Sequence, residues 1–162
     1  MIDLDPELAF VGAVLSLSAT TAAEALAVIE DDDLADPRLQ LILQAARQLV
    51  ARDVTPDGYA VMALIRRAGT AATAHNLTSI AHLILEAIEA CPVAASWRFH
   101  AVAVLDERLR RRCRELSARI GQAANGPLDT LVALVDAESS AVTALDGRRA
   151  TLQPAPRLGV AA

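Results

Sequence analysis

The sequence predicts an all-α protein, and three observations support this fold class. Apolar residues make up 54% of the 162 residues but aromatic residues only 2%, so most apolar side chains are aliphatic. Alanine and leucine are the strongest apolar helix formers, and only seven glycines are available to interrupt helices. A β-sandwich or barrel would require frequent turn residues and many β-branched or aromatic ones. We therefore expect a compact bundle of about five short helices, followed by a long helix and an antiparallel helical hairpin.

Capping signals predict the first two helices. Asp5 precedes Pro6, which combines an N-cap residue with a proline at the first helical position, so a helix is expected from Pro6 to about Ser18. Thr21 is followed three residues later by Glu24, which is the pattern of a capping box. This pattern predicts that a short second helix begins at Thr21.

Three further short helices follow from similar signals. Residues 36–37 repeat the Asp-Pro pattern and predict the start of a third helix. Residues 55–57, Thr-Pro-Asp, predict the start of a fourth in the same way, and Gly69 is expected to end it. A fifth helix is expected to end at residues 91–92, where proline follows cysteine.

The C-terminal third has a different organisation. One long helix is expected over 94–124, with a break at 125–127, where the sequence is Asn-Gly-Pro, and a second helix after it. These two helices should form an antiparallel hairpin. The sequence thus predicts a globular helical subdomain at 1–92, a hairpin at 93–146 and a disordered tail at 147–162.

Apolar residues recur at spacings of three and four along both predicted hairpin helices. Because two helices alone bury only one seam, such a hairpin usually requires a partner. The residues predicted to form the seam and the pairing face are Leu105, Leu109, Leu116, Ile120, Leu131, Val135 and Val142.

All 15 basic residues are arginine, and this excludes two classes of enzyme. A P-loop ATPase needs a lysine to contact the β- and γ-phosphates, and a Schiff-base enzyme needs a lysine amine. The net charge is −5, and the acidic residues are concentrated in the first part of the chain.

The densest charged feature is an arginine run at 108–114. Two interpretations stay open: phosphate contacts with DNA, or a charged helix face balanced by neighbouring acidic residues. No aromatic residue is interleaved in the run, and Trp97 and Phe99 are expected in the core. The residues assigned to a polar rim or to nucleic-acid contact are Arg108, Arg111, Arg112 and Arg114.

No catalytic, metal or cofactor site is expected. His75 and His82 are seven residues apart, without further convergent ligands, and the acidic run at 30–33 lacks the glycine turn of a calcium loop. No nucleophile elbow or glycine-rich phosphate loop is present. Cys91 and Cys113 do not form a disulfide framework, and this usage is typical of a reducing cytoplasm, where we expect the protein to act.

The order of these elements resembles the N-terminal domain of hexameric replicative DNA helicases of the DnaB type. The similarity covers about residues 5–146. It departs from the family where Leu34 replaces an aromatic residue, and where 39–43 lacks a histidine and a phenylalanine. Two segments carry named motifs: 7–15, which contains Glu7 and Gly12, and 54–57, where a Pro-Asp step is followed by Val61, Leu64 and Gly69. The other positions of similarity are 33–34, 39–43, 91–95, 100–101, Arg111 and 137–139.

The resemblance implies a globule with a helical hairpin whose hairpins pair into a collar that also receives primase and helicase loaders. Since the chain has no Walker motif, we expect a stand-alone, non-catalytic module of DNA replication without ATPase or helicase activity. It would associate with itself as a homo-oligomer, dimeric or higher, or with a helicase, primase or helicase loader. The alternatives are a DNA-binding accessory factor and a functionless helicase remnant.

Overall fold

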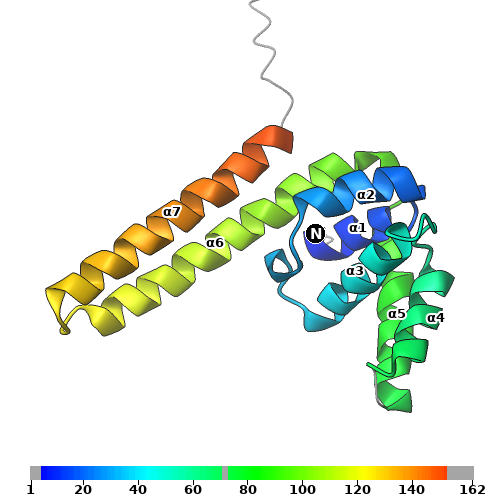
Figure 1. Cartoon of the computed structure of the whole chain (residues 1–162), viewed down its shortest axis with the longest axis horizontal. Coiled ribbons are helices and arrows are strands. Elements are labelled where there is room, and N and C mark those ends of the chain that lie inside the picture. Colours follow the sequence, from blue (N-terminus) through cyan, green and yellow to red (C-terminus); the bar gives the residue numbers. More distant parts are fainter. Residues whose placement is uncertain (1–4, 71–72, 153–162) are drawn as a thin grey trace, which may run out of the picture. The chain divides into compact units, whose positions relative to one another are not determined.

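The computed structural model describes residues 5–70 and 73–152, and every regular element in those ranges is helical (Figure 1). This confirms the all-α fold class. The helices are α1 Pro6–Val14, α2 Ala19–Val28, α3 Pro37–Val50, α4 Gly58–Ala68, α5 Ala74–Ala90, α6 Trp97–Ala123 and α7 Leu128–Leu152, with short 3-10 helices η1 Asp31–Asp33 and η2 Ala94–Ser96.

The chain divides into two compact units, an N-terminal unit of residues 1–104 and a hairpin unit of residues 105–162. The boundary lies inside α6, whereas the sequence placed it at the start of that helix. The first two turns of α6 belong to the N-terminal unit, and Trp97, Ala101 and Val104 in these turns are buried, with exposed fractions of 3%, 0% and 0%.

Helix α1 is the centre of the N-terminal unit. It contacts α2, α3 and α5, and nearly all its side chains are buried, including Phe10, Val11 and Val14 with no exposed surface. A helix that is apolar on all sides has to be enclosed by others. Gly12 allows α1 to approach α5 closely, because a Cβ atom at this position would lie 1.8 Å from the carbonyl oxygen of Ala87 in α5. The two helix backbones therefore touch at this crossing.

The helix ends confirm most of the predicted caps and correct two. Asp5 caps α1 and Asp36 caps α3 as expected, and Gly69 ends α4 in the left-handed conformation, with φ of 65°. Helix α2 begins earlier than predicted, because Ser18 caps it and Thr21 lies inside its first turn. Asp57, not a residue before it, caps α4 by accepting a hydrogen bond of 2.8 Å from the amide of Ala60.

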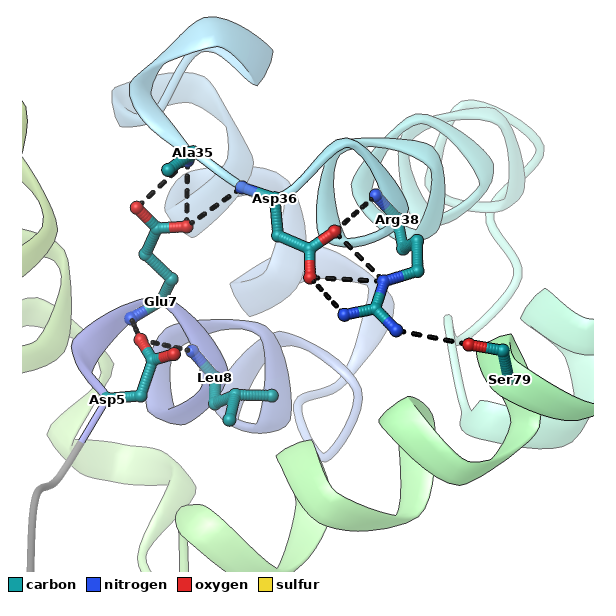
Figure 2. A network of polar contacts seen from close by, with 7 residues as sticks. All are labelled: Asp5, Glu7, Leu8, Ala35, Asp36, Arg38 and Ser79. Atoms are coloured by element: carbon teal, nitrogen blue, oxygen red, sulfur yellow. Dashed lines mark hydrogen bonds and ion pairs between the residues drawn. The ribbon is translucent and has the colours of Figure 1, made fainter. Parts of the chain in front are cut away.

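A buried carboxylate joins α1 to the segment before α3 (Figure 2). Glu7, which is only 8% exposed, accepts hydrogen bonds of 2.9 and 2.8 Å from the Ala35 amide and one of 3.4 Å from the Asp36 amide. Next to it, hydrogen bonds from Arg38 are the main cause that lowers the pKa of Asp36 below its usual value. Arg38 also donates to the hydroxyl of Ser79, so this network connects α1, α3 and α5.

Replacing Glu7 with alanine is expected to lower the free energy of unfolding by about 2–3 kcal/mol, because two backbone amides lose the charged acceptor of part-buried hydrogen bonds. Chemical denaturation followed by circular dichroism measures this effect. The matched control is Glu24→Ala, which removes an exposed ion pair with Arg98 and is expected to change stability by less than about 0.5 kcal/mol. Equal effects of the two substitutions would contradict a structural role for Glu7.

Helix α7 extends beyond the predicted end of the hairpin at residue 146. The sequence interpretation took Gly147 as the start of a disordered tail, but 147–152 is helical and continues the pattern of the helix. Leu152 is buried seven residues after buried Leu145, and Arg149 forms an ion pair with Asp106 of α6. These contacts outweigh the low helix propensity of one glycine. The rest of the expected tail, 153–162, lies outside the described residues.

Candidate association site on the helical hairpin

Helices α6 and α7 lie side by side and run antiparallel within the hairpin unit (Figure 1). Ion pairs define the alignment. Asp106 of α6 pairs with Arg149 of α7, and Arg112, later in α6, pairs with Glu138, earlier in α7. The antiparallel hairpin predicted from the sequence is therefore present.

The middle of the hairpin seam is ionic. Glu138 is 7% exposed, and its carboxylate accepts a hydrogen bond of 2.8 Å from Arg112 and a second from Arg119. A buried carboxylate requires such partners because an unpaired charge is costly in a low-dielectric seam. Residues 137–139 were predicted only as part of the family resemblance, and this ionic layer was not predicted. The signal was that Glu138 falls at the same heptad spacing as Leu131 and Leu145.

The predicted apolar residues differ in their exposure. Leu105 is fully buried and Val135 is 38% exposed. The other five are partly buried: Leu109, Leu116, Ile120, Leu131 and Val142.

Several of these side chains share one side of the hairpin. The paired residues Glu138 and Arg112 mark the direction of the seam on α7 and α6, and successive residues of a helix are about 100° apart. Around α7, Val135 lies about 60° from Glu138. Around α6, Leu109 and Ile120 lie about 60° and 80° from Arg112, in the same rotational sense. Since the helices are antiparallel, offsets of the same sense fall on the same side of the seam. The hairpin thus carries several apolar side chains on that side.

This surface includes two exposed residues that the predicted set lacked. Leu128 is 71% exposed and Val132 is 50% exposed, and both lie on the side of α7 that carries Val135. Their spacing of three and four residues was the signal that could have identified them. We call the whole surface the hairpin apolar face, formed by Leu109, Leu116, Ile120, Leu128, Val132, Val135 and Val142.

The arginine run is largely occupied by interactions within the hairpin. Arg112 pairs with Glu138, Arg110 with Glu107, and Arg108 with Glu115 at 3.9 Å. Arg111 is partly buried and Arg114 is exposed. Trp97 is buried as predicted, but Phe99 is 74% exposed, so the expectation that both are core residues was wrong for Phe99. Position 99 lies on the outer side of α6, two residues after Trp97.

Two residues with reactive side chains, Cys91 and His100, have shifted pKa values. Burial raises the pKa of the Cys91 thiol, which opposes formation of the nucleophilic thiolate. Burial also lowers the pKa of His100, so its imidazole is neutral at pH 7. Residues 5–70 and 73–152 contain no group of three or more metal-ligating side chains.

None of the described helices is by itself long and apolar enough to cross a membrane. A bent pair, Ala74–Ala90 with Ala94–Ala123, meets the length and composition criteria only when the two segments are taken together. Such a pair is weak support for a membrane span because buried core helices have the same composition.

Comparison with known proteins gives a structural match. No protein family matches the sequence, and no curated protein matches it. Among solved structures, the crystal structure of the N-terminal domain of DnaB helicase from Mycobacterium tuberculosis has a TM-score of 0.68 and 24% sequence identity. The match covers 88% of this chain and 96% of that chain. The chain therefore has the fold of the DnaB helicase N-terminal domain, as the order of its motifs predicted.

Proposed function

We propose that this protein is a non-catalytic accessory module of DNA replication that associates with a second copy of itself through the hairpin apolar face. The observation that carries the proposal is the exposure of Leu128, Val132 and Val135 on one side of a two-helix unit. Contiguous exposed apolar surface of this kind is typical of protein interfaces. A two-fold dimer would bring the same face of both copies together.

The charged residues support a protein partner over DNA. The carboxylates of Glu107, Glu115 and Glu138 pair with arginines of the predicted run, which reduces the positive charge offered to phosphates. Arg111 and Arg114 lie about 100° and 160° from Arg112 in the opposite rotational sense, so they point away from the hairpin apolar face. The fold similarity to a helicase domain makes a replicative helicase, a primase or a helicase loader the alternative partner of the same face.

The substitution pair Val132→Asp and Val135→Asp tests this proposal. Both side chains are exposed, so the hairpin should fold, whereas a charge on each apolar contact should weaken self-association by about 100-fold or more. Leu109 and Leu116 are less suitable, because both are partly buried beside the seam. Light scattering after size exclusion measures the mass, alone and with the host's replicative helicase.

The matched control is Ala133→Asp with Ala137→Asp, which introduces the same charges at exposed positions on the other side of α7. This control should retain the mass of the dimer, twice the 17.1 kDa of one chain. A wild-type protein that is strictly monomeric and does not co-elute with the helicase would refute the proposal. Tight binding of an oligonucleotide that weakens steeply with salt would instead favour the DNA-binding alternative.

A further inference from the structure

A second exposed surface lies on the N-terminal unit, along the outer side of α4. Val61 and Ile65 on the inner side of this helix are buried, with 0% and 1% exposed surface. The opposite side forms an open hollow of about 470 Å³. The residues that line it are Tyr59, Met62, Ala63, Arg66 and Arg67.

The apolar part of this surface is unusually accessible. Tyr59 is 85% exposed, the largest value among the exposed large hydrophobic residues of the described chain. Met62 is partly buried beside it, and Ala63 is small enough to let a second chain approach the helix closely. Exposed tyrosine and methionine side chains are enriched in protein interfaces, because a flat ring and a flexible thioether adapt to different partners.

The charged part of this surface contrasts with the rest of the unit. Residues 1–104 contain 13 acidic residues and six arginines. Three of these arginines are neutralised by carboxylates: Arg38 with Asp36, Arg47 with Asp31, and Arg98 with Glu24. Arg66 and Arg67 are exposed, and no ion pair is described for either in residues 5–70 and 73–152. The helix dipole favours positive charge in the last turn of α4, but it does not explain the exposed Tyr59.

We propose that this outer face of α4 binds an acidic peptide segment of a partner protein. An apolar side chain of the segment would pack on Tyr59 and Met62, and two of its carboxylates would pair with Arg66 and Arg67. Bidentate arginine–carboxylate pairs give such a contact its geometric specificity. Single-stranded nucleic acid fits less well, because a longer positive groove is needed to follow a phosphate backbone. This surface is independent of the hairpin apolar face.

Fluorescence anisotropy with a set of labelled 15-residue peptides tests the proposal on the full chain. The peptides differ only in four charged positions, which are Glu, Gln or Lys, and in one anchor, which is Phe or Ala. The Glu peptide with the Phe anchor should bind most tightly. Arg66→Glu with Arg67→Glu should weaken this binding at least about tenfold, as should Tyr59→Ala.

Two controls make the result specific. Arg52→Glu makes the same substitution at one other exposed arginine of the unit, half of the charge change of the double variant, and it should leave binding within about twofold. Val132→Asp with Val135→Asp should also leave it unchanged, so that failure of this proposal is distinguishable from failure of the dimer. The proposal is overturned if no peptide binds, if Gln or Lys peptides bind equally well, or if an oligonucleotide competes for Arg66 and Arg67.

Discussion

Replacing Gly12 with alanine is expected to destabilise the N-terminal unit by about 3 kcal/mol or more, because the added Cβ would lie 1.8 Å from the Ala87 carbonyl oxygen. Both sides of this contact are helix backbone, which cannot rotate away as a side chain would. The expected loss corresponds to a decrease in Tm of roughly 10 °C or more. Thermal unfolding followed by circular dichroism measures it directly.

The control for this prediction is the same substitution at Gly121. A Cβ atom at Gly121 of α6 has no neighbouring atom within 4 Å, so Gly121→Ala should stabilise the helix by about 0.5–1 kcal/mol. Opposite signs at the two positions are the expected result. If Gly12→Ala were as stable as the wild type, the close crossing of α1 and α5 would be wrong.

Replacing Glu138 with alanine is expected to destabilise the hairpin unit by about 2–3 kcal/mol, because Arg112 and Arg119 would face the seam without their carboxylate. This value is below that for a fully buried ion pair, since the Arg119 side chain is 55% exposed. Urea denaturation gives the total change. Amide hydrogen exchange should place the loss of protection in α6 and α7.

A compensating pair of substitutions tests the physical cause. Glu138→Leu combined with Arg112→Leu replaces the two least exposed members of the ionic layer with apolar side chains. The third member, Arg119, is 55% exposed and can turn towards water, so the double substitution should recover most of the lost stability. Glu115→Ala removes a carboxylate that is 56% exposed and lies 3.9 Å from Arg108, and it should change stability by less than about 0.5 kcal/mol. A double substitution that is no more stable than Glu138→Ala would contradict the ionic layer as the cause.

Elements whose signals are local were predicted well from the sequence. Asp-Pro pairs at helix starts, Gly69 and the break at 125–127 set backbone conformation through nearby atoms, so they can be read without knowledge of the fold. The helix end predicted at Gly147 from neighbouring residues was wrong. The helix continues because Arg149 and Leu152 make contacts with residues distant in the sequence. The helix start predicted at Thr21 was wrong, because the Thr21 amide donates its hydrogen bond to the Ser18 hydroxyl, which caps the helix instead.

The candidate sites depend on contacts between distant residues, and there the sequence was less informative. Helical periodicity selected apolar residues of the hairpin, but it could not separate Leu105, which is fully buried, from Val135, which is exposed. The arginine run looked like a single basic surface, whereas its members point in different directions around α6 and several have acidic partners. Glu7 was noted for the family resemblance, and its hydrogen bonds to residues 35 and 36 emerge only in the fold.

The complete enclosure of α1 has a consequence for how the N-terminal unit unfolds. Because α1 touches α2, α3 and α5, the surrounding helices rely on it as their common neighbour. If α1 detached, the other helices would be left around an empty volume the size of a helix, lined with aliphatic side chains exposed to water. No partly folded arrangement of the remaining helices is therefore stable, and the N-terminal unit is expected to lose its structure in a single all-or-none transition.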